Sequence, residues 1–283
     1  MDLSILDLDK KVIPLDKWAD QAVDWLVLNY REVFQLIKWP VERTLEGLNS
    51  GLSSLHPLIV IAIIGVIAWR AAGYKLSLFT IITFIVVGLL GLWADTMTTL
   101  AMVLCAVVFC TIIGVPLGIF AGRNDTFESF LRPILDAMQT TPPFVYLVPV
   151  VMLFSVGTVA GVLATIIFAL PPIIRLTSLG IRQVHPELVE AALAFGATKR
   201  QVLYKVQLPL ARTTIMAGLN QTIMMSLSMV VIAALIGAGG LGMPVVRGLN
   251  NMDIGLAVIA GISIVLMAMV LDRVTQALGK KQN

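Results

Sequence analysis

Few side chains in this sequence are arranged so that they could carry out chemistry. Residues 237–242 read Gly-Ala-Gly-Gly-Leu-Gly and fit the phosphate-binding pattern G-x-G-x-x-G, which has meaning only between a strand and a helix. Here the pattern follows a long apolar segment, so we expect a tight turn. Cys105 and Cys110 fall inside one apolar segment, which favours two small buried side chains over a disulfide or a metal pair. His56 and His185 are far apart, with no metal-ligand spacing around either.

An ATP-hydrolysing or covalent mechanism also finds no support in the residue pattern. The sequence has no G-x-x-x-x-G-K-[ST] motif, which would cradle the phosphates of ATP, and no visible pairing of a nucleophile with a base. We therefore expect no catalytic residue, no cofactor and no metal site in this chain.

The most informative stretch is a polar, basic loop at residues 180–209. Pro186 suits the first turn of a helix, where its missing N–H costs nothing. Gly196 stands where a left-handed residue would end that helix. Thr198 and Gln201 have the spacing of a capping box, which predicts a second helix. We expect the proline that closes this stretch to end the second helix.

In this loop Glu190-Ala191-Ala192 is followed, after three intervening residues, by Gly196, and later by Val206 and Leu208-Pro209. This spacing resembles the EAA loop of importer-type ABC transporter permeases, which usually has Ile where this chain has Val206. The resemblance implies a cytoplasmic coupling helix that docks into a groove on an ATPase subunit. The residues it implies for ATPase coupling are Glu190, Ala191, Ala192, Phe195, Gly196, Leu208 and Pro209.

The residue types agree with docking. The small side chains of this loop allow close backbone approach, and Leu188 and Phe195, seven positions apart, are suitable apolar anchors for a helix lying in a groove. The alternative is an ordinary loop helix between two membrane spans.

Composition indicates a polytopic membrane protein. The 283 residues are 58% hydrophobic and 13% charged, with a mean hydropathy of +0.93, whereas soluble domains carry about 25% charged residues. The acidic start MDLSILDLD does not suit a cleavable signal peptide. We expect an all-α bundle with about seven spans, near residues 52–69, 76–93, 97–121, 134–155, 158–179, 213–236 and 254–276.

The distribution of basic residues predicts the orientation of these spans. One set of connections, which includes the loop at 180–212 and the C-terminus, carries 13 Lys or Arg residues, whereas the opposite set carries only Arg247. Since cytoplasmic loops are rich in Lys and Arg, this loop and the C-terminus should be cytoplasmic. With seven spans, the N-terminal tail should then lie outside.

The tail itself, residues 1–51, is too charged to span a membrane. From Trp18 to Trp39 it has a helical pattern, with aromatic residues suited to the boundary between water and lipid. An interfacial amphipathic helix and a helix packed on a partner subunit both fit.

Prolines inside several predicted spans should kink their helices. They are Pro116, the run Thr140-Thr141-Pro142-Pro143, Pro149 and Pro171-Pro172. Carbonyls freed in this way are tolerated in a membrane only where protein or water meets them, so the span from Ile134 to Phe154 is a candidate pore wall.

The sixth span carries unusually many polar side chains, which should face the bundle interior either to join helices or to line the pathway. Phe144 and Tyr146, beside the paired prolines, could touch a cation, although structural packing is the better interpretation. The candidate pathway residues are Thr140, Thr141, Tyr146, Asn220, Gln221 and Ser226.

Residues 138–279 as a whole resemble the permease subunit of glycine betaine/proline/choline ABC importers. The similar segments are MQTTPPFVYLVPVVMLF, TIIFALPPIIRLT, KVQLPLARTTIMAGLNQTIMMSLSMVVIAALIGAGGLG and LDRVTQALGK. The resemblance implies a type I permease in the bacterial inner membrane, assembled as a homodimer with two ATPases that bind ATP and magnesium. It also implies that a separate binding protein delivers a quaternary ammonium solute such as glycine betaine, choline or proline betaine.

The expected organisation has three parts: the tail at 1–51, two accessory transmembrane helices at 52–93, and a permease core at 94–279 that contains the cytoplasmic coupling loop 180–212. Nothing in it suggests a nucleic-acid partner.

Other functions remain open. One is an ABC permease for another solute, such as an amino acid or a sulfonate. Another is an ion-coupled secondary transporter, but Asp95, Asp136 and Asp272 all lie near predicted span ends, where they are poorly placed as mid-membrane ion sites. A mechanosensitive channel would have no use for the loop around Glu190.

Overall fold

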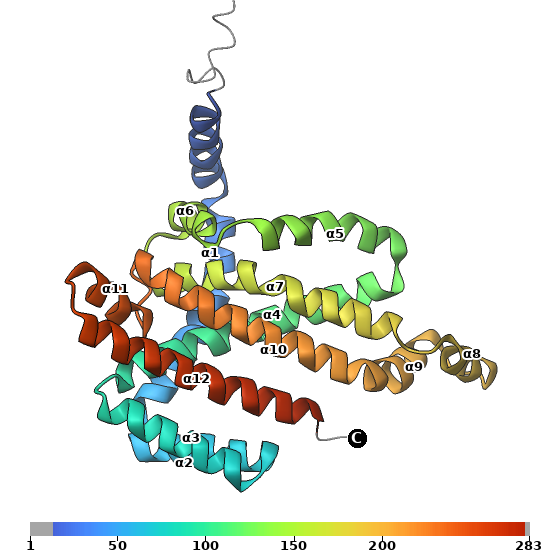
Figure 1. The fold of residues 1–283 in the computed structure, drawn as a ribbon. Helices are drawn as coiled ribbons and strands as arrows, with labels where there is room; N and C mark the ends of the chain where they lie inside the picture. Colours follow the sequence, from blue (N-terminus) through green and yellow to red (C-terminus); the bar gives the residue numbers. More distant parts are fainter. Residues whose placement is uncertain (1–13, 281–283) are drawn as a thin grey trace, which may run out of the picture.

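The computed structural model of the chain describes residues 14–280, and these form only helices and short connections (Figure 1). This confirms the all-α prediction. A π-helical turn, Leu203–Gln207, joins α9 to α10, and a short 3-10 turn, Ala234–Ile236, follows α10. The helices are α1 Leu15–Ser54, α2 Pro57–Ala72, α3 Tyr74–Leu89, α4 Trp93–Arg123, α5 Asp125–Thr140, α6 Pro143–Phe154, α7 Thr158–Arg182, α8 Pro186–Ala194, α9 Lys199–Val202, α10 Leu208–Ala233, α11 Gly242–Asn250 and α12 Ile254–Lys280.

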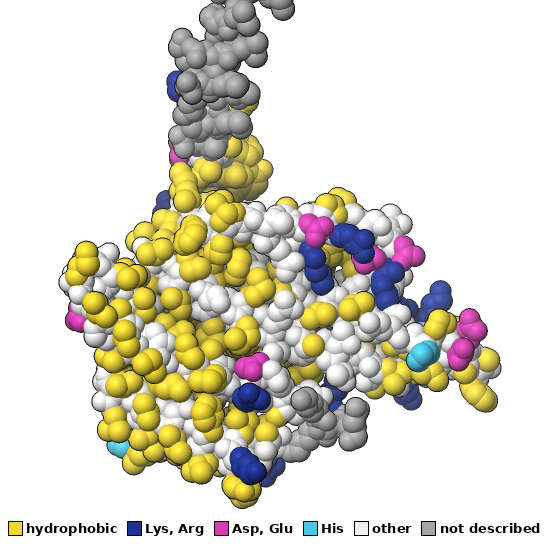
Figure 2. Space-filling view, in the orientation of Figure 1, with side chains coloured by type: hydrophobic (Ala, Val, Ile, Leu, Met, Phe, Trp, Pro, Cys, Tyr) yellow, Lys and Arg dark blue, Asp and Glu magenta, His cyan; other side chains and the backbone are white. Residues whose placement is uncertain are grey.

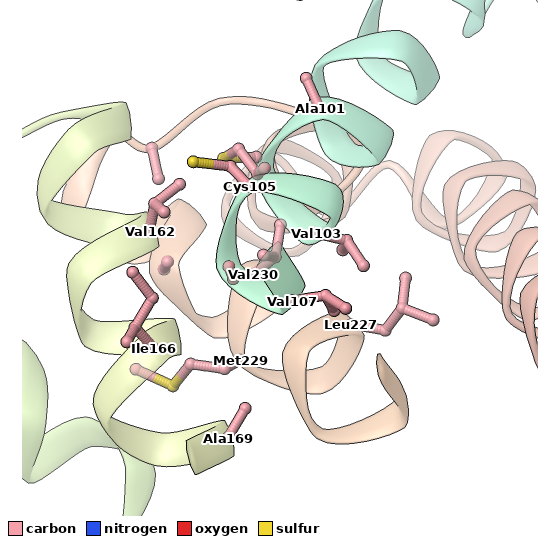
Figure 3. Packing of buried hydrophobic residues seen from close by; sticks show 14 of the residues in the cluster. Ala101, Val103, Cys105, Val107, Val162, Ile166, Ala169, Leu227, Met229 and Val230 are labelled. Atoms are coloured by element: carbon pink, nitrogen blue, oxygen red, sulfur yellow. The ribbon is translucent and has the colours of Figure 1, made fainter. Parts of the chain in front are cut away.

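The core is built from α4, α7 and α10, which lie side by side (Figure 1). Figure 3 shows side chains from all three helices meeting, among them Cys105 of α4, Val162 of α7 and Met229 of α10, each fully buried. The cysteines are free and buried, as predicted, and no group of potential metal ligands occurs among the described residues.

Close contact between α4 and α7 depends on a stripe of glycines spaced four residues apart. A Cβ on Gly114 would lie 2.3 Å from Ile173, and one on Gly118 would lie 2.7 Å from the Ile174 carbonyl oxygen. Small residues at this spacing let two membrane helices approach closely and pack by van der Waals contact. The helix that ends next to the polar loop is therefore held tightly against α4.

Four helices are long and apolar enough to cross a membrane: α4, α7, the continuous helix 199–236, and α12. Two bent pairs satisfy the same test together, α1 with α2 and α5 with α6, which brings the total to as many as six within residues 14–280. The predicted total of about seven also included residues 76–93. These correspond to α3, which is apolar but has 16 residues, fewer than the ~20 that span a bilayer core.

Two predicted spans are not straight helices. The expected span 134–155 is divided between α5 and α6, which meet at 99°, and the expected span 52–69 crosses a 111° bend between α1 and α2. Each break lies at prolines that open the next helix: His56 directly precedes Pro57 and Thr141 directly precedes Pro142, and both have extended ψ angles, of 137° and 127°. Proline disfavours helical geometry in the residue that precedes it, which accounts for both positions.

The other prolines leave their helices undivided. Pro116 lies inside α4, Pro149 inside α6, and Pro171 with Pro172 inside α7, and each helix continues beyond them. Pro171 and Pro172 are buried in the bundle, so neighbouring helices surround the part of the backbone where hydrogen bonds are lost.

The tail helix is confirmed, but it continues to Ser54, beyond the predicted boundary at residue 51. Its C-terminal half packs on the bundle through Val41 and Leu45, which are buried, whereas Trp18 and Trp25 are exposed. Figure 1 shows α1 crossing the bundle steeply and extending past it. The acidic start of the sequence, on which the signal-peptide prediction rests, lies outside the described residues.

The glycine-rich stretch after α10 is a turn, as predicted, and no strand occurs in residues 14–280. Gly237, Gly239 and Gly240 have positive φ angles of 74°, 83° and 67°. The Leu241 N–H donates a 2.8 Å hydrogen bond to Thr99 Oγ1 of α4. A Cβ on Gly240 would lie 2.4 Å from the same oxygen. Only glycine fits here, and the turn is thereby fixed to α4.

Candidate functional site

The polar loop forms a protruding pair of short helices, α8 and α9, at one end of the bundle (Figure 1). Pro186 occupies the first turn of α8, as predicted, and Glu187 adds a negative charge near its N-terminus. At the other end of α8, Gly196 has φ +82°. Its N–H donates to the Leu193 carbonyl at 2.9 Å, and the Ala197 N–H donates to the Ala192 carbonyl at 3.0 Å. These two bonds make a Schellman motif, so the predicted glycine cap is confirmed.

The capping box that begins α9 is also confirmed. Thr198 Oγ1 accepts a 3.3 Å hydrogen bond from the Gln201 N–H, and Gln201 Oε1 accepts a 2.8 Å bond from the Thr198 N–H. The cap of α9 lies four residues after the end of α8, so the second helix starts in a fixed direction. The turn between α8 and α9 is determined by local hydrogen bonds.

Pro209 does not end the second helix, contrary to prediction. The chain passes from α9 through the π-helical turn into α10, where Pro209 lies in the first turn. The Leu208 N–H donates to the carbonyl of Leu203, five residues earlier. A proline in an ordinary helix loses one hydrogen bond and its ring clashes with the carbonyl four residues back. A π-helical turn is wider there, so the helix continues, and α9 is joined directly to a membrane helix.

A small buried cluster attaches this loop to the bundle. Ile181 of α7, Leu203 of the π-helical turn and Ala211 of α10 are buried against one another. Leu208, one of the expected coupling residues, packs against this cluster and is half-buried. A displacement of α9 would therefore be transmitted to α7 and α10, because close-packed side chains do not compress.

The outer face of the loop, by contrast, is unburied. None of the residues of α8 is buried, and Phe195 is 93% exposed, with Leu188 at 46%. An exposed phenylalanine at the tip of a projecting helix is the type of residue that anchors a helix in a partner's groove. Of the expected coupling residues, Glu190, Ala191, Phe195, Gly196 and Pro209 are exposed, and Ala192 and Leu208 are partly buried.

The first set of expected pathway residues lies at the α5–α6 break. Thr140 and Thr141 hydroxyls donate to backbone carbonyls one turn earlier, Thr141 to Ala137 at 2.7 Å. The Tyr146 hydroxyl donates to the Met138 carbonyl across the break, and its ring contacts Phe168 of α7. These bonds hold the bend in shape, which agrees with the packing interpretation of Tyr146.

The second set lies on α10. Asn220 Nδ2 donates a 2.9 Å hydrogen bond to Asp272 of α12. Ser226 and Thr222 are fully buried, and neither hydroxyl has a hydrogen-bond partner among the described residues, whereas Gln221 is exposed. Tyr146 of the first set thus contacts α7, whereas Asn220 of the second contacts α12, and within residues 14–280 no hydrogen bond joins the two sets.

Ion pairs between α5 and α7 were not foreseen in the sequence. Arg175 pairs with Asp136, and Arg182 contacts Asp125 at 2.6 Å and Glu128 at 3.0 Å. Figure 2 shows these charged side chains as a group near the end that carries α8. The three acids lie at positions 125, 128 and 136 of α5, intervals of three and eight residues that place them on one helix face and could have revealed the pairing.

These pairs border a cavity of about 250 Å³ between α5 and α7. Its wall includes Arg132 and Ser178, and the Ser178 hydroxyl is buried without a hydrogen-bond partner in the described residues. These charged pairs join α5 to α7, and within α5 only Leu135 is buried.

Comparisons with known proteins agree with this geometry. Residues 114–283 match the family described as binding-protein-dependent transport system inner membrane component. The chain is 52% identical to the glycine betaine/proline betaine transport system permease protein ProW of Escherichia coli, over 98% of this chain and 78% of that protein. It is 44% identical to the glycine betaine transport system permease protein OpuAB of Bacillus subtilis, over 95% of this chain and 96% of that protein.

A solved structure shares the fold. The MetNI methionine ABC transporter in an inward-facing conformation aligns with a TM-score of 0.56 at 24% identity, over 64% of this chain and 92% of that chain. The aligned part of this chain is about as long as the segment from α4 to α12, which leaves out the tail helix α1 and the short helices α2 and α3.

Proposed function

Because the chain belongs to the binding-protein-dependent transport system inner membrane component family, we propose that it forms the translocation pathway of an ATP-driven importer for a quaternary ammonium compatible solute. It is a multi-pass membrane permease subunit of the ABC importer class with a type I fold. The solutes proposed are glycine betaine, choline and proline betaine.

One observation carries the choice of substrate. The 52% identity with a glycine betaine/proline betaine permease extends over 98% of this chain, including the tail helix and both short helices. A second permease, named for glycine betaine transport, is similar over nearly its whole length. The likeness to a methionine transporter, at 24% identity, concerns the fold alone.

The proposed assembly contains two copies of this permease, two cytoplasmic ATPase subunits and a separate substrate-binding protein. The family description, which names a binding protein, supports the last of these. ATP and magnesium would bind to the ATPase subunits, since this sequence contains no P-loop. The permease would thus contribute coupling and a pathway, and no catalytic residue.

The proposed coupling runs through α8. Leu188 and Phe195 would fill a groove on the ATPase, and Ala191 with Gly196 would allow its surface to approach the backbone. Closure of the ATPase dimer would move α8 and α9 as one body, because the Schellman motif and the capping box fix the turn between them. The Ile181–Leu203–Ala211 cluster would then pass the displacement to the spans.

The proposed pathway lies along the α5–α6 break and α10, with Thr140, Thr141, Tyr146, Asn220, Gln221 and Ser226 as candidates. Support comes from the bend and from the polar content of α10: two hydroxyls of that helix are buried without a partner among the described residues. Such groups are costly in an apolar interior, and a hydrated pathway or a second permease copy would satisfy them.

The proposed location is the bacterial inner membrane, with the C-terminus and α8 in the cytoplasm and the N-terminal tail in the periplasm. This orientation requires α3 to cross the membrane in addition to the six spans. The strong bias of Lys and Arg to one set of connections supports this orientation. The tail helix α1, bent by 111° from α2, would then lie near the outer surface of the membrane.

The test is ATPase activity of the permease reconstituted with its ATPase and binding protein, titrated separately with glycine betaine, choline, carnitine and proline betaine. We expect stimulation by at least one quaternary ammonium solute. Stimulation by an amino acid or a sulfonate instead would overturn the substrate assignment while leaving the importer class intact. Uptake that survives ATP depletion and collapses with an uncoupler would contradict the importer class itself.

A further inference from the structure

A groove of about 580 Å³ lies between α3 and α12, away from the coupling loop and the proposed pathway. Lys75 and Arg273 line it together with apolar side chains, chiefly Leu76, Phe79 and Met269. Both basic side chains are exposed, and neither forms an ion pair with any residue between 14 and 280. The groove thus combines two uncompensated positive charges with an apolar wall.

Each of the two helices continues this pattern along one exposed face. On α3, Lys75 is followed at helical spacing by exposed apolar residues, namely Phe79, Ile82, Val86 and Leu89. On α12, Arg273 is preceded at the same kind of spacing by Met269, Val265, Ile262 and Val258, also exposed. Positions three or four residues apart lie on one side of a helix, so each stripe is apolar along its length and basic at one end.

The basic ends lie where a membrane surface is expected. Figure 1 places the connection from α2 to α3 and the end of α12 at the end of the bundle that carries α8. Trp69 and Tyr74, which flank this connection, are 61% and 69% exposed, and exposed aromatic residues of this type gather at membrane–water interfaces. In Figure 2 the Lys and Arg side chains in this region stand against a largely hydrophobic surface.

The acid that is adjacent to Arg273 in the sequence forms no ion pair with it. Asp272 is adjacent to Arg273, but its Oδ1 accepts hydrogen bonds from Asn220 at 2.9 Å and from Gln276 at 2.7 Å. Asn220 belongs to α10, so this carboxylate is directed to the side of α12 that faces α10. The charge of Arg273 is therefore available to a ligand outside the bundle.

We propose that the groove between α3 and α12 binds a phospholipid with an anionic headgroup, the headgroup at Lys75 and Arg273 and the acyl chains along the two apolar stripes. Basic pockets between membrane helices are suited to such headgroups. A water-soluble subunit could not cover stripes that run along the length of the spans. A second copy of the chain in a twofold contact would bring like charges together, because the same patch faces itself.

The test measures which lipids remain with the full-length permease. The protein is reconstituted in vesicles of phosphatidylglycerol and phosphatidylcholine at a fixed ratio and extracted in mild detergent, and the retained headgroups are quantified. We expect phosphatidylglycerol to be enriched roughly tenfold over the bulk ratio, and Lys75→Gln/Arg273→Gln to reduce this to the bulk ratio. The control Arg43→Gln/Arg247→Gln removes the same charge elsewhere and should retain the enrichment.

Two further measurements test whether a soluble phosphate ester or a second copy of the permease occupies the groove instead. Displacement of the retained lipid by soluble glycerol 3-phosphate would overturn the proposal, because the acyl chains would then contribute nothing. A thiol introduced by Met269→Cys can be distinguished from the native cysteines, which are buried. Disulfide formation between two such copies in the membrane would assign the groove to a permease–permease contact and also overturn the proposal. Equal enrichment in the Lys75→Gln/Arg273→Gln variant would do so as well.

Discussion

Replacement of Gly196 by valine should uncouple the permease from its ATPase without unfolding the bundle. Gly196 has φ +82°, and a Cβ placed there would meet no atom within 4 Å. The cost of a side chain is thus confined to backbone strain, about 1–2 kcal/mol for a left-handed residue and more for a β-branched one. If the backbone at residue 196 relaxed to a negative φ, the two hydrogen bonds of the Schellman motif would break, at a cost of about 1 kcal/mol each.

These terms set the size of the effect. A penalty of about 2 kcal/mol on the folded turn would reduce its population roughly 30-fold relative to the frayed form. Because α8 contributes no buried residue, the loss should fall on the orientation of α8 and not on the thermal stability of the bundle. A graded series follows: Gly196→Asn should be nearly normal, since asparagine tolerates the left-handed region, Gly196→Ala intermediate, and Gly196→Val the most impaired.

The assay is solute-stimulated ATPase activity of the reconstituted complex, with co-purification of the ATPase and thermal unfolding measured on the same samples. Gly47→Val serves as the control, because that glycine lies in α1, has no positive φ and also has open space around a Cβ. The reasoning would be refuted if Gly196→Val and Gly196→Asn stimulated the ATPase equally. A large loss of thermal stability in Gly196→Val would refute it too, by showing that the loop supports the bundle.

Three other changes have defined expectations. Phe195→Ala should weaken co-purification of the ATPase with an unchanged Tm, because this side chain is 93% exposed; an unchanged pull-down would exclude it as an anchor. Gly240→Ala should destabilise the bundle by about 2–4 kcal/mol, since its Cβ would lie 2.4 Å from Thr99 Oγ1. Gly239→Ala should cost only about 1–2 kcal/mol, because the nearest atom to its Cβ would be 3.8 Å away. Equal Tm values for the two variants would contradict this difference. Arg182→Gln should destabilise the bundle by about 1 kcal/mol after allowance for solvent, and so lower the Tm, because its contacts with Asp125 and Glu128 of α5 and with the Ala121 carbonyl of α4 are lost. An unchanged Tm would mean that other contacts hold α5 on the bundle.

Features determined by neighbouring residues were predictable from the sequence. The glycine cap at Gly196 and the capping box at Thr198 depend on residues within five positions, and residue type alone identifies them. The turn at 237–242 was predictable for the same reason, because glycine is the residue that readily adopts positive φ. The buried state of Cys105 and Cys110 followed from their apolar surroundings.

Features that depend on distant residues were not predictable in this way. Arg182 lies 57 residues from Asp125, and Arg175 lies 39 residues from Asp136, so their pairing requires the packing of α5 on α7. The outcome at each proline was also undetermined: a break of 99° follows Thr141, whereas Pro116 stays within α4. The outcome depends on whether neighbouring side chains pack around the carbonyl that has lost its hydrogen bond. A single sequence does not show which residues those neighbours are.

The π-helical turn at 203–207 has a consequence for the direction in which the loop points. Each residue of an α-helix advances the chain by about 100° around the helix axis, and a π-helical turn accommodates one residue more than an α-helical turn. The π-helical turn therefore absorbs one residue with little change of direction. If the same residues formed a regular α-helix, α8 and α9 would be rotated by about 100° relative to α10. Leu203 would leave the buried position it shares with Ile181, and Phe195 would face a different direction. The π-helical form of residues 203–207 thus sets the direction in which the projecting loop points.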